Sequence, residues 1–268
     1  MSRWILLIIV GMMLPLAACS SSSSWEEEDV PAARHRLLAE DIQAIWTLEQ
    51  KQGSGGAGTL IRLEIRQQDG EPVDEFDITH EKLLHLIVVS KDLSYFNHIH
   101  PEYKGKGVFE IIMDFPAGGD YRLIADFRPT DGDATTKMEW VRVEGTPAEP
   151  VPLLPDPALA KSADGYRVEL AVDRLAAKEP TTLMFTIADE KTGEPIADLE
   201  PYLGAIGHVV ILSEDGQRYV HAHAEEDQGS GPQASFEAEF PRSGVYKIWG
   251  QFQRDGHVFT VPFIVKVE

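Results

Sequence analysis

The chain has 268 residues, of which 44 are Asp or Glu and 24 are Lys or Arg, so its formal net charge at pH 7 is −20. This charge argues against nucleic acid as a partner, because contacts with phosphate dominate the affinity of proteins for DNA and RNA. Cys19 is the single cysteine, which excludes an internal disulfide. If the thiol of Cys19 is modified, catalysis by a cysteine nucleophile is excluded as well.

The N-terminus has the pattern of a bacterial lipoprotein signal. Arg3 precedes a short apolar segment, residues 4–16, which is shorter than the about 20 residues that a membrane span needs. The sequence Leu-Ala-Ala-Cys that ends at Cys19 resembles a lipobox. The resemblance implies removal of residues 1–18 and lipid attachment at Cys19, which anchors the mature chain to a membrane outside the cytoplasm. The alternative is an ordinary signal peptide that happens to contain a cysteine.

The remainder is predicted to contain a tether, two domains and a linker. Residues 19–31 are rich in serine and acidic residues and are expected to form a solvated tether. Residues 32–146 and 158–268 are predicted to be two homologous domains, each long enough to bury a hydrophobic core. The linker between them, residues 147–157, contains five prolines, which favour an extended chain.

Both domains are predicted to be all-β. Short segments that alternate between apolar and polar residues recur, as at residues 59–66 and 166–172, and Asp-Gly turn signals separate them. About six or seven such strands per hundred residues indicate two tandem immunoglobulin-like antiparallel β-sandwiches. Only residues 34–46 have a pattern compatible with a helix.

Three histidines occur at the same spacing in both domains. In each copy a lone histidine precedes an H-x-H pair by thirteen residues, and Gly-Glu-Pro lies fifteen residues before the lone histidine. A Phe-Pro segment followed by Gly-x-Tyr also lies downstream in each copy. The unit, about a hundred residues long, is too long for a solenoid repeat and indicates duplicated domains. The two sets are His85, His98 and His100, and His208, His221 and His223.

Each histidine set lies on a predicted β-hairpin. A four-residue loop at residues 91–94 closes the first hairpin, and a two-residue Asp215-Gly216 turn closes the second. Directly opposed residues and alternate residues of a strand share a face, so the three imidazoles of each hairpin are expected to converge. The expected pairs are His85 with His100, Ile87 with His98, His208 with His223, and Val210 with His221.

Converging imidazoles are typical of a transition-metal site. We expect one copper or zinc ion per repeat, with Glu102 and Glu225 as fourth ligands or as acceptors for a ring N–H. The compartment, and a resemblance described below, favour copper. The alternative is that the histidines are structural and hydrogen-bond to backbone carbonyl groups.

The first hairpin carries apolar side chains on both faces, so we expect it to be covered on both sides. Either a loop at residues 200–207 or the second domain can supply the second cover. Burial of the histidines would lower their pKa values and keep the rings neutral.

Residues 85–102 resemble a segment of uncharacterised exported bacterial lipoproteins, and residues 240–252 resemble its usual companion. At the level of the fold, the repeats are similar to YtkA-like and FixH-like envelope modules. This resemblance implies an immunoglobulin-like fold and an envelope location. The second copy departs from the pattern at Ala224, where the first copy has Pro101.

These patterns predict a membrane-anchored metal carrier, buffer or sensor outside the cytoplasm, with a partner among envelope proteins of metal handling. The alternative function is a non-enzymatic immunoglobulin-like interaction module. We expect no nucleotide, because a β-like segment rather than a helix follows the G-x-G-x-x-G at residues 53–58. No motif identifies a substrate, so no enzymatic activity is expected.

Overall fold

The computed structural model describes residues 36–53 and 56–268, and residues 36–268 form one compact unit. The expected signal peptide, the expected lipidation site Cys19 and the expected tether lie outside the described residues. Within the part of the chain that is described, no helix combines the length and the apolar character needed to cross a membrane.

The helix expected within residues 34–46 does not form. Residues Ala39–Asp41 make one 3-10 turn, η1, and strand β1 (Ile42–Gly53) begins directly after it. From Ile42 onward alternate side chains, including those of Ala44 and Trp46, pack against the core. A period of two residues is typical of a strand that is buried on one face, and it overrides the weaker helical pattern.

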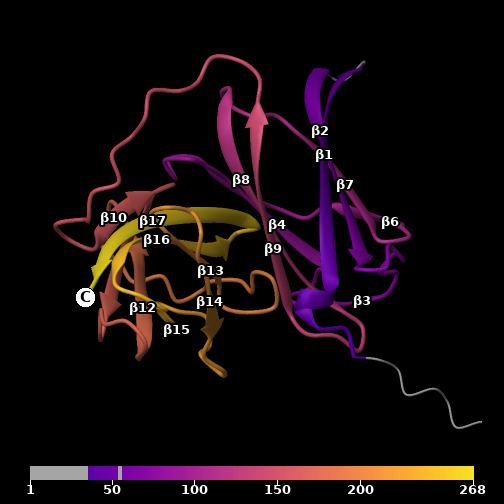
Figure 1. The fold of residues 1–268 in the computed structure, drawn as a ribbon. Coiled ribbons are helices and arrows are strands. Elements are labelled where there is room, and N and C mark those ends of the chain that lie inside the picture. Colours follow the sequence, from indigo (N-terminus) through magenta and orange to yellow (C-terminus); the bar gives the residue numbers. More distant parts are fainter. Residues whose placement is uncertain (1–35, 54–55) are drawn as a thin grey trace, which may run out of the picture. The chain divides into compact units, whose positions relative to one another are not determined.

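The first repeat is a sandwich of two antiparallel sheets (Figure 1). One sheet has the order β1-β2-β7-β6, and in the other β4 lies between β5 and β8, while β8 also pairs with β3 and β9. The side chains between the sheets form one hydrophobic core. The further strands are β2 (Gly56–Gln67), β3 (Phe76–Asp77), β4 (Leu84–Ser90), β5 (Phe96–Ile99), β6 (Glu102–Gly105), β7 (Val108–Met113), β8 (Gly119–Pro129) and β9 (Thr135–Val143).

The second repeat has the same antiparallel character but a continuous hydrogen-bonded path, β10-β11-β12-β15-β14-β13-β16-β17. Strand β14 pairs with both β13 and β15, so it joins the two layers of this sandwich. A second hydrophobic core fills the space between the layers. The strands are β10 (Ala160–Ala163), β11 (Tyr166–Val172), β12 (Pro180–Asp189), β13 (His208–Ser213), β14 (Tyr219–Ala224), β15 (Gln233–Glu239), β16 (Gly244–Arg254) and β17 (His257–Val267).

The predicted fold class, two immunoglobulin-like antiparallel sandwiches, is confirmed. The predicted hairpin registers are also confirmed where the strands pair, since Ile87 lies opposite His98 and Val210 lies opposite His221. The turn of the second hairpin differs from the prediction. Ser213 hydrogen-bonds to Arg218 across a four-residue loop, residues 214–217, as in the first hairpin.

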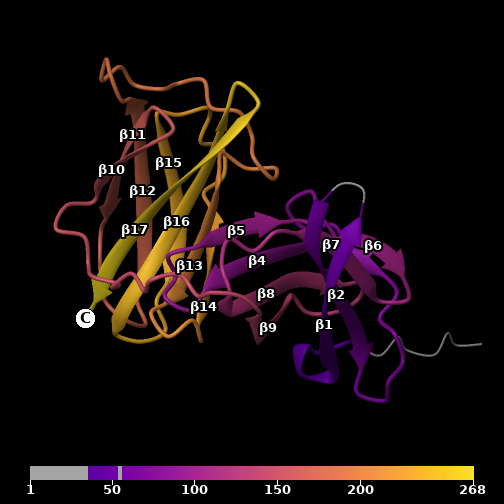
Figure 2. The ribbon, with the colours of Figure 1, turned by 90° about the horizontal axis from the view of Figure 1, so that it is seen from above.

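Figure 2 shows where the strands β4 and β13 of the two repeats meet. A third apolar cluster joins the repeats along these strands. Alternate residues of β4 divide between two environments: Leu86 and Val88 enter the core of the first repeat, whereas Ile87 and Val89 enter this shared cluster. The ring of Phe96 stacks on that of Trp249, with ring centres 4.8 Å apart. The second repeat is therefore the cover that the two-sided apolar pattern of the first hairpin predicted.

Candidate metal centre

Three histidines of the first repeat meet at the end of the β4–β5 hairpin. His85 lies on β4 and His98 on β5, and the antiparallel pairing of the strands sets them near each other. His100 follows Ile99, the last residue of β5. Pro101 comes next, and proline has no N–H for a ladder hydrogen bond and restricts the residue before it. The strand ends there, and the ring of His100 lies against that of His85.

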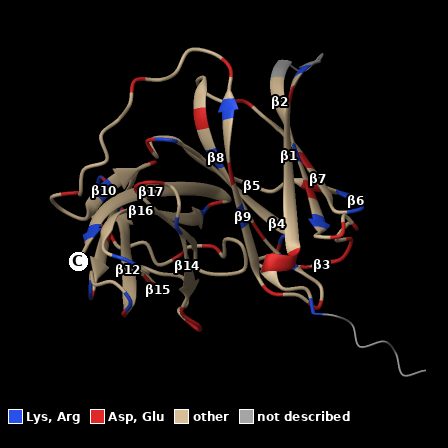
Figure 3. Ribbon diagram, in the orientation of Figure 1, with Lys and Arg blue, Asp and Glu red and all other residues tan. Residues whose placement is uncertain are grey.

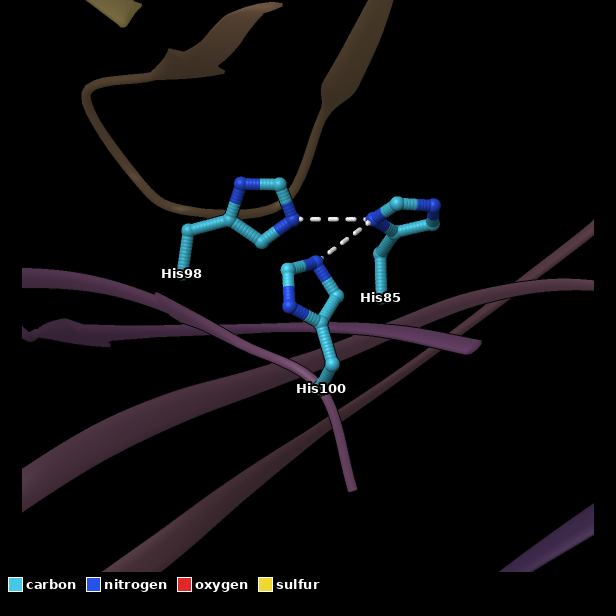
Figure 4. A group of neighbouring side chains, drawn as sticks. All are labelled: His85, His98 and His100. Atoms are coloured by element: carbon cyan, nitrogen blue, oxygen red, sulfur yellow. Dashed lines mark hydrogen bonds between the residues drawn. The ribbon is translucent and has the colours of Figure 1, made fainter. Parts of the chain in front are cut away.

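The ring nitrogens of this triad lie at close range (Figure 4). Nδ1 of His85 is 3.0 Å from Nε2 of His98 and 3.2 Å from Nε2 of His100. The three ring centres are 5.0 to 5.2 Å apart. Among the described residues, these three are the only group of three or more His, Cys, Asp or Glu whose ligand atoms all lie within 4.8 Å of one another.

The outer nitrogens of two of these rings are bonded to oxygen acceptors. His85 Nε2 lies 3.0 Å from the backbone oxygen of Thr79, which can only accept, so this nitrogen carries the N–H of the neutral ring. His98 Nδ1 donates to Oε1 of Gln251 at 2.8 Å, and the amide nitrogen of Gln251 donates to Thr260 at 3.3 Å. Nδ1 of His85 and Nε2 of His98 therefore face each other as two lone pairs.

Two facing lone pairs repel each other unless a cation lies between them. A metal ion about 2.0–2.1 Å from each nitrogen, with bond angles of about 90–110°, places the nitrogens about 2.9–3.4 Å apart. The observed separations of 3.0 and 3.2 Å fall in this range. The bonds to Thr79 and Gln251 correspond to the outer hydrogen bonds that orient histidine ligands in metal sites.

Burial keeps the triad neutral. His85 and His98 are 2% and 9% exposed. Loss of solvation lowers the pKa of His85, lowers that of His98 to about 3 and, together with the neighbouring His85, lowers that of His100 to about 4. At neutral pH the rings therefore offer lone pairs, as metal binding requires, and a bridging proton is disfavoured because it would leave a charge buried.

The structure does not bring the second set of histidines together. His221 and His223 are exposed on β14, with parallel rings whose centres are 6.4 Å apart. His223 lies opposite Glu237 of β15, so the strand pairing directs this part of the chain away from β13. His208, the third member of that set, lies with the triad of the first repeat.

The ring of His208 has its centre 4.7 Å from that of His98 and 5.8 Å from that of His85. Its Nδ1 atom is buried and has no hydrogen-bond partner among the described residues. Burial, followed by the neighbouring histidines, holds the pKa of His208 well below its usual value. Among the described residues, the histidines of the second repeat therefore do not form a separate cluster as expected, and His208 lies beside the triad of the first repeat.

The two expected carboxylate ligands are not part of the cluster. The side chain of Glu102 is 77% exposed and pairs with Lys104 at 2.6 Å. Glu225 is exposed beyond the end of β14. Both follow their H-x-H pair by two residues, but the chain has already turned away from the histidines at these positions.

Two residues of the cluster were not found from the sequence. His80 is exposed in the turn before β4, with its ring centre 6.0 Å from His85 and 5.8 Å from His208. The position 123 residues later is Leu203, so the duplication gave no signal for His80. Gln251 belongs to the other repeat, and only the packing of the repeats brings it to His98.

The contacts between the repeats are reciprocal. His98 contacts Gln251, and His221 Nδ1 lies 3.8 Å from Oδ2 of Asp126. His221 is 123 residues after His98, and Gln251 is 125 residues after Asp126, so these are equivalent positions of the two copies. His85 and His208 are also equivalent, and their rings stack on each other. Equivalent faces of the two repeats therefore meet at the cluster.

A family described as "Domain of unknown function (DUF8832)" matches residues 40–145 and again residues 161–268. The chain belongs to this family. A search of curated proteins finds no match.

Solved structures that match this chain include a bacterial adhesin, a bacterial integrin-binding protein and a chicken protein. The Escherichia coli adhesin FdeC is 15% identical, with a TM-score of 0.27, and the match covers 85% of this chain and 64% of that one. A segment of two fibronectin type-III domains from chicken tenascin is 14% identical, with a TM-score of 0.25 and coverage of 84% and 100%. Invasin, a bacterial integrin-binding protein, is 13% identical, with a TM-score of 0.24 and coverage of 85% and 39%.

Proposed function

We propose that this protein is a lipid-anchored, non-enzymatic metal-binding protein that carries, buffers or senses copper outside the cytoplasm. The observation that carries the proposal is the close approach of the inner ring nitrogens of His85 and His98, 3.0 Å apart, with the ring of His100 beside them. Oxygen acceptors hold the outer nitrogens of the first two rings, so a cation between the inner nitrogens would complete the arrangement.

Copper is the proposed ion because the donors are imidazole nitrogens. Zinc also accepts such donors, but the affinity of a given nitrogen site for divalent first-row metals is highest for Cu(II). The acidic residues, marked in red on the ribbon of both repeats in Figure 3, raise the local concentration of cations without choosing among them.

The proposed location rests on the N-terminal sequence. A short apolar segment followed by Leu-Ala-Ala-Cys supports export and lipid attachment at Cys19. The similarity to YtkA-like and FixH-like envelope modules stays a prediction that supports the same location. An envelope protein that delivers or receives the metal is the partner we expect.

Metal titration of the lipid-free mature chain tests the proposal. The chain carries Cys19→Ser, so that no thiol competes for the metal, and is titrated at pH 7 with Cu(II) and, separately, with Zn(II). We expect one ion per chain and loss of this binding in the double variant His98→Ala, His100→Ala. The matched control is His221→Ala, His223→Ala, which removes the equivalent but exposed pair and should leave the binding unchanged.

Absence of uptake, or equal uptake by the His98→Ala, His100→Ala variant, would overturn the proposal. Two ions per chain, with one lost in each double variant, would instead restore the expectation of one site per repeat.

A second candidate function is a non-enzymatic immunoglobulin-like interaction module of the cell envelope, in which the histidines are structural. The favouring observation is that His98 bonds to Gln251 of the other repeat and His85 bonds to the backbone at Thr79. In that case a chelator should leave the melting temperature unchanged, whereas His85→Ala should lower it strongly. Metal binding that raises the melting temperature of the original chain but not of the His85→Ala chain would favour the metal site instead.

A further inference from the structure

We propose that His208 of the second repeat is the fourth ligand of the same ion, so that both repeats hold one metal. This inference rests on the proposed metal site and adds to it a ligand from a different strand, β13. It replaces the expectation of two separate sites with one closed site at the junction of the repeats.

The first observation is the unpaired nitrogen of His208. Nδ1 is buried and has no hydrogen-bond partner among the residues that the structure describes, whereas each ring nitrogen of His85 and of His98 has another nitrogen or an oxygen atom at 2.8 to 3.0 Å. Buried polar atoms of native proteins nearly always have a partner, and an unpaired one calls for a missing water or ion. A metal ion bound beside the ring is a partner that also explains why three more imidazoles gather there.

The second observation is the spacing of the rings. The centre of an imidazole lies about 3.2 Å from a metal bound through one nitrogen, so two ligands at about 90–110° have centres about 4.5–5.2 Å apart, and wider angles give larger separations. The ring centre of His208 lies 4.7 Å from that of His98 and 5.8 Å from that of His85. In the structure, Nδ1 of His208 lies outside the tight group formed by the triad. Small changes of side-chain torsion would bring this nitrogen to the metal as a fourth ligand, because the ring centres already have suitable separations.

The other candidates for a fourth ligand are less suitable. His80 is exposed in a turn, and Glu102 is exposed and paired with Lys104. His208 instead lies at the start of β13, whose following residues are buried in the cores around the junction. A rigid strand places a ligand more accurately than a turn does.

A fourth protein ligand has a consequence for function. Four-coordinate sites filled by protein side chains are closed, whereas sites that keep an open position are typical of catalysis. A closed site that draws on both repeats suits retention or sensing, because loss of the ion removes a link between the repeats.

The test combines ligand counting with a matched pair of variants of the lipid-free mature chain. X-ray absorption of the Cu(II) and Zn(II) forms counts the imidazoles bound to the metal, and competition with a chelator gives the affinity. We expect four imidazoles in the original chain and three in His208→Ala. We expect His208→Ala to weaken binding at least about tenfold, since loss of an outer partner alone costs 10–100-fold. His257→Ala is the control, because it removes an exposed histidine of the same repeat.

The outcomes separate the two proposals. Three imidazoles in the original chain, or unchanged affinity and imidazole count in His208→Ala, would overturn the role of His208 and leave the metal site of the first repeat standing. If the original chain binds no metal, the proposed function itself fails. Should His208→Ala not fold, His208→Gln, which nearly keeps the volume of the side chain, replaces it, and the imidazole count of the original chain decides the question without any variant.

Discussion

The β4–β5 and β13–β14 hairpins have the same three histidines, the same register and loops of the same length, yet only the first gathers its histidines. The residue after the H-x-H pair differs: Pro101 in the first repeat and Ala224 in the second. Strand β5 ends before Pro101, and its continuation, β6, pairs with β7. Strand β14 instead runs on and pairs with β15. Equal spacing in the sequence therefore gives different sites when the strand continues in one copy and stops in the other.

The two hairpins also differ in how deeply their contact with the other repeat is buried. His98 is 9% exposed and contacts Gln251, which is 4% exposed. The equivalent contact joins His221, which is exposed, to the partly exposed Asp126 across 3.8 Å. One of two equivalent contacts is buried and the other faces solvent, so substitutions at matched positions should have unequal effects.

The largest expected effect is the loss of stability of the metal-free protein in acid. The pKa of His98 is lowered by burial to about 3 in the folded chain, below the ordinary value of 6.5. Between pH 6.5 and about 3 the unfolded chain therefore binds more protons, so stability is complete above pH 6.5 and falls as the pH decreases. Each such histidine contributes up to about 1.4 kcal/mol per pH unit to this slope.

Urea unfolding of the chelator-treated chain at several pH values between 4 and 7 measures this slope. The variant His98→Gln should have a shallower slope than the original chain, because one buried histidine no longer gains a proton on unfolding. Equal slopes in the two chains would show that His98 is not held neutral by burial.

The next effect concerns the two equivalent contact partners. Gln251→Ala removes the acceptor that fixes the tautomer of His98 and should weaken Cu(II) binding about 10–100-fold, as is typical of residues that orient a ligand. Asp126→Ala removes the equivalent partner of the exposed His221 and should change the Cu(II) affinity by less than about threefold, since polar contacts at the surface contribute little. Chelator competition measures both affinities, and equal losses in the two variants would contradict the proposed role of Gln251.

The sequence was sufficient to predict the sandwich fold and the hairpin registers. Alternation of apolar residues fixes which side chains share a face, and that pattern is local, so Ile87 opposite His98 and Val210 opposite His221 could be predicted. The local sequence could not predict that His223 turns away from β13, because its direction depends on the pairing of β14 with β15. The place of His208 depends on how the two repeats pack, which neither copy of the repeat encodes alone.

The smallest expected effect comes from exchanging the residues that end the two hairpins. In Pro101→Ala the backbone regains an N–H, so β5 can extend past Ile99 and direct His100 as β14 directs His223. We expect Cu(II) affinity to fall by no more than about tenfold, because the imidazole of His100 is kept and only the fraction of molecules in which β5 extends past Ile99 loses it as a ligand.

The converse exchange, Ala224→Pro, should shorten β14 without creating a second site, because His208 is already held at the first one. The number of Cu(II) ions bound per chain by Ala224→Pro, measured by titration, should therefore stay at one. A second ion in that variant would mean that the proline alone decides whether a copy of the repeat binds metal, and that His208 is free to serve its own hairpin. Unchanged affinity in Pro101→Ala would mean that packing against the second repeat, rather than the end of β5, holds His100 in place.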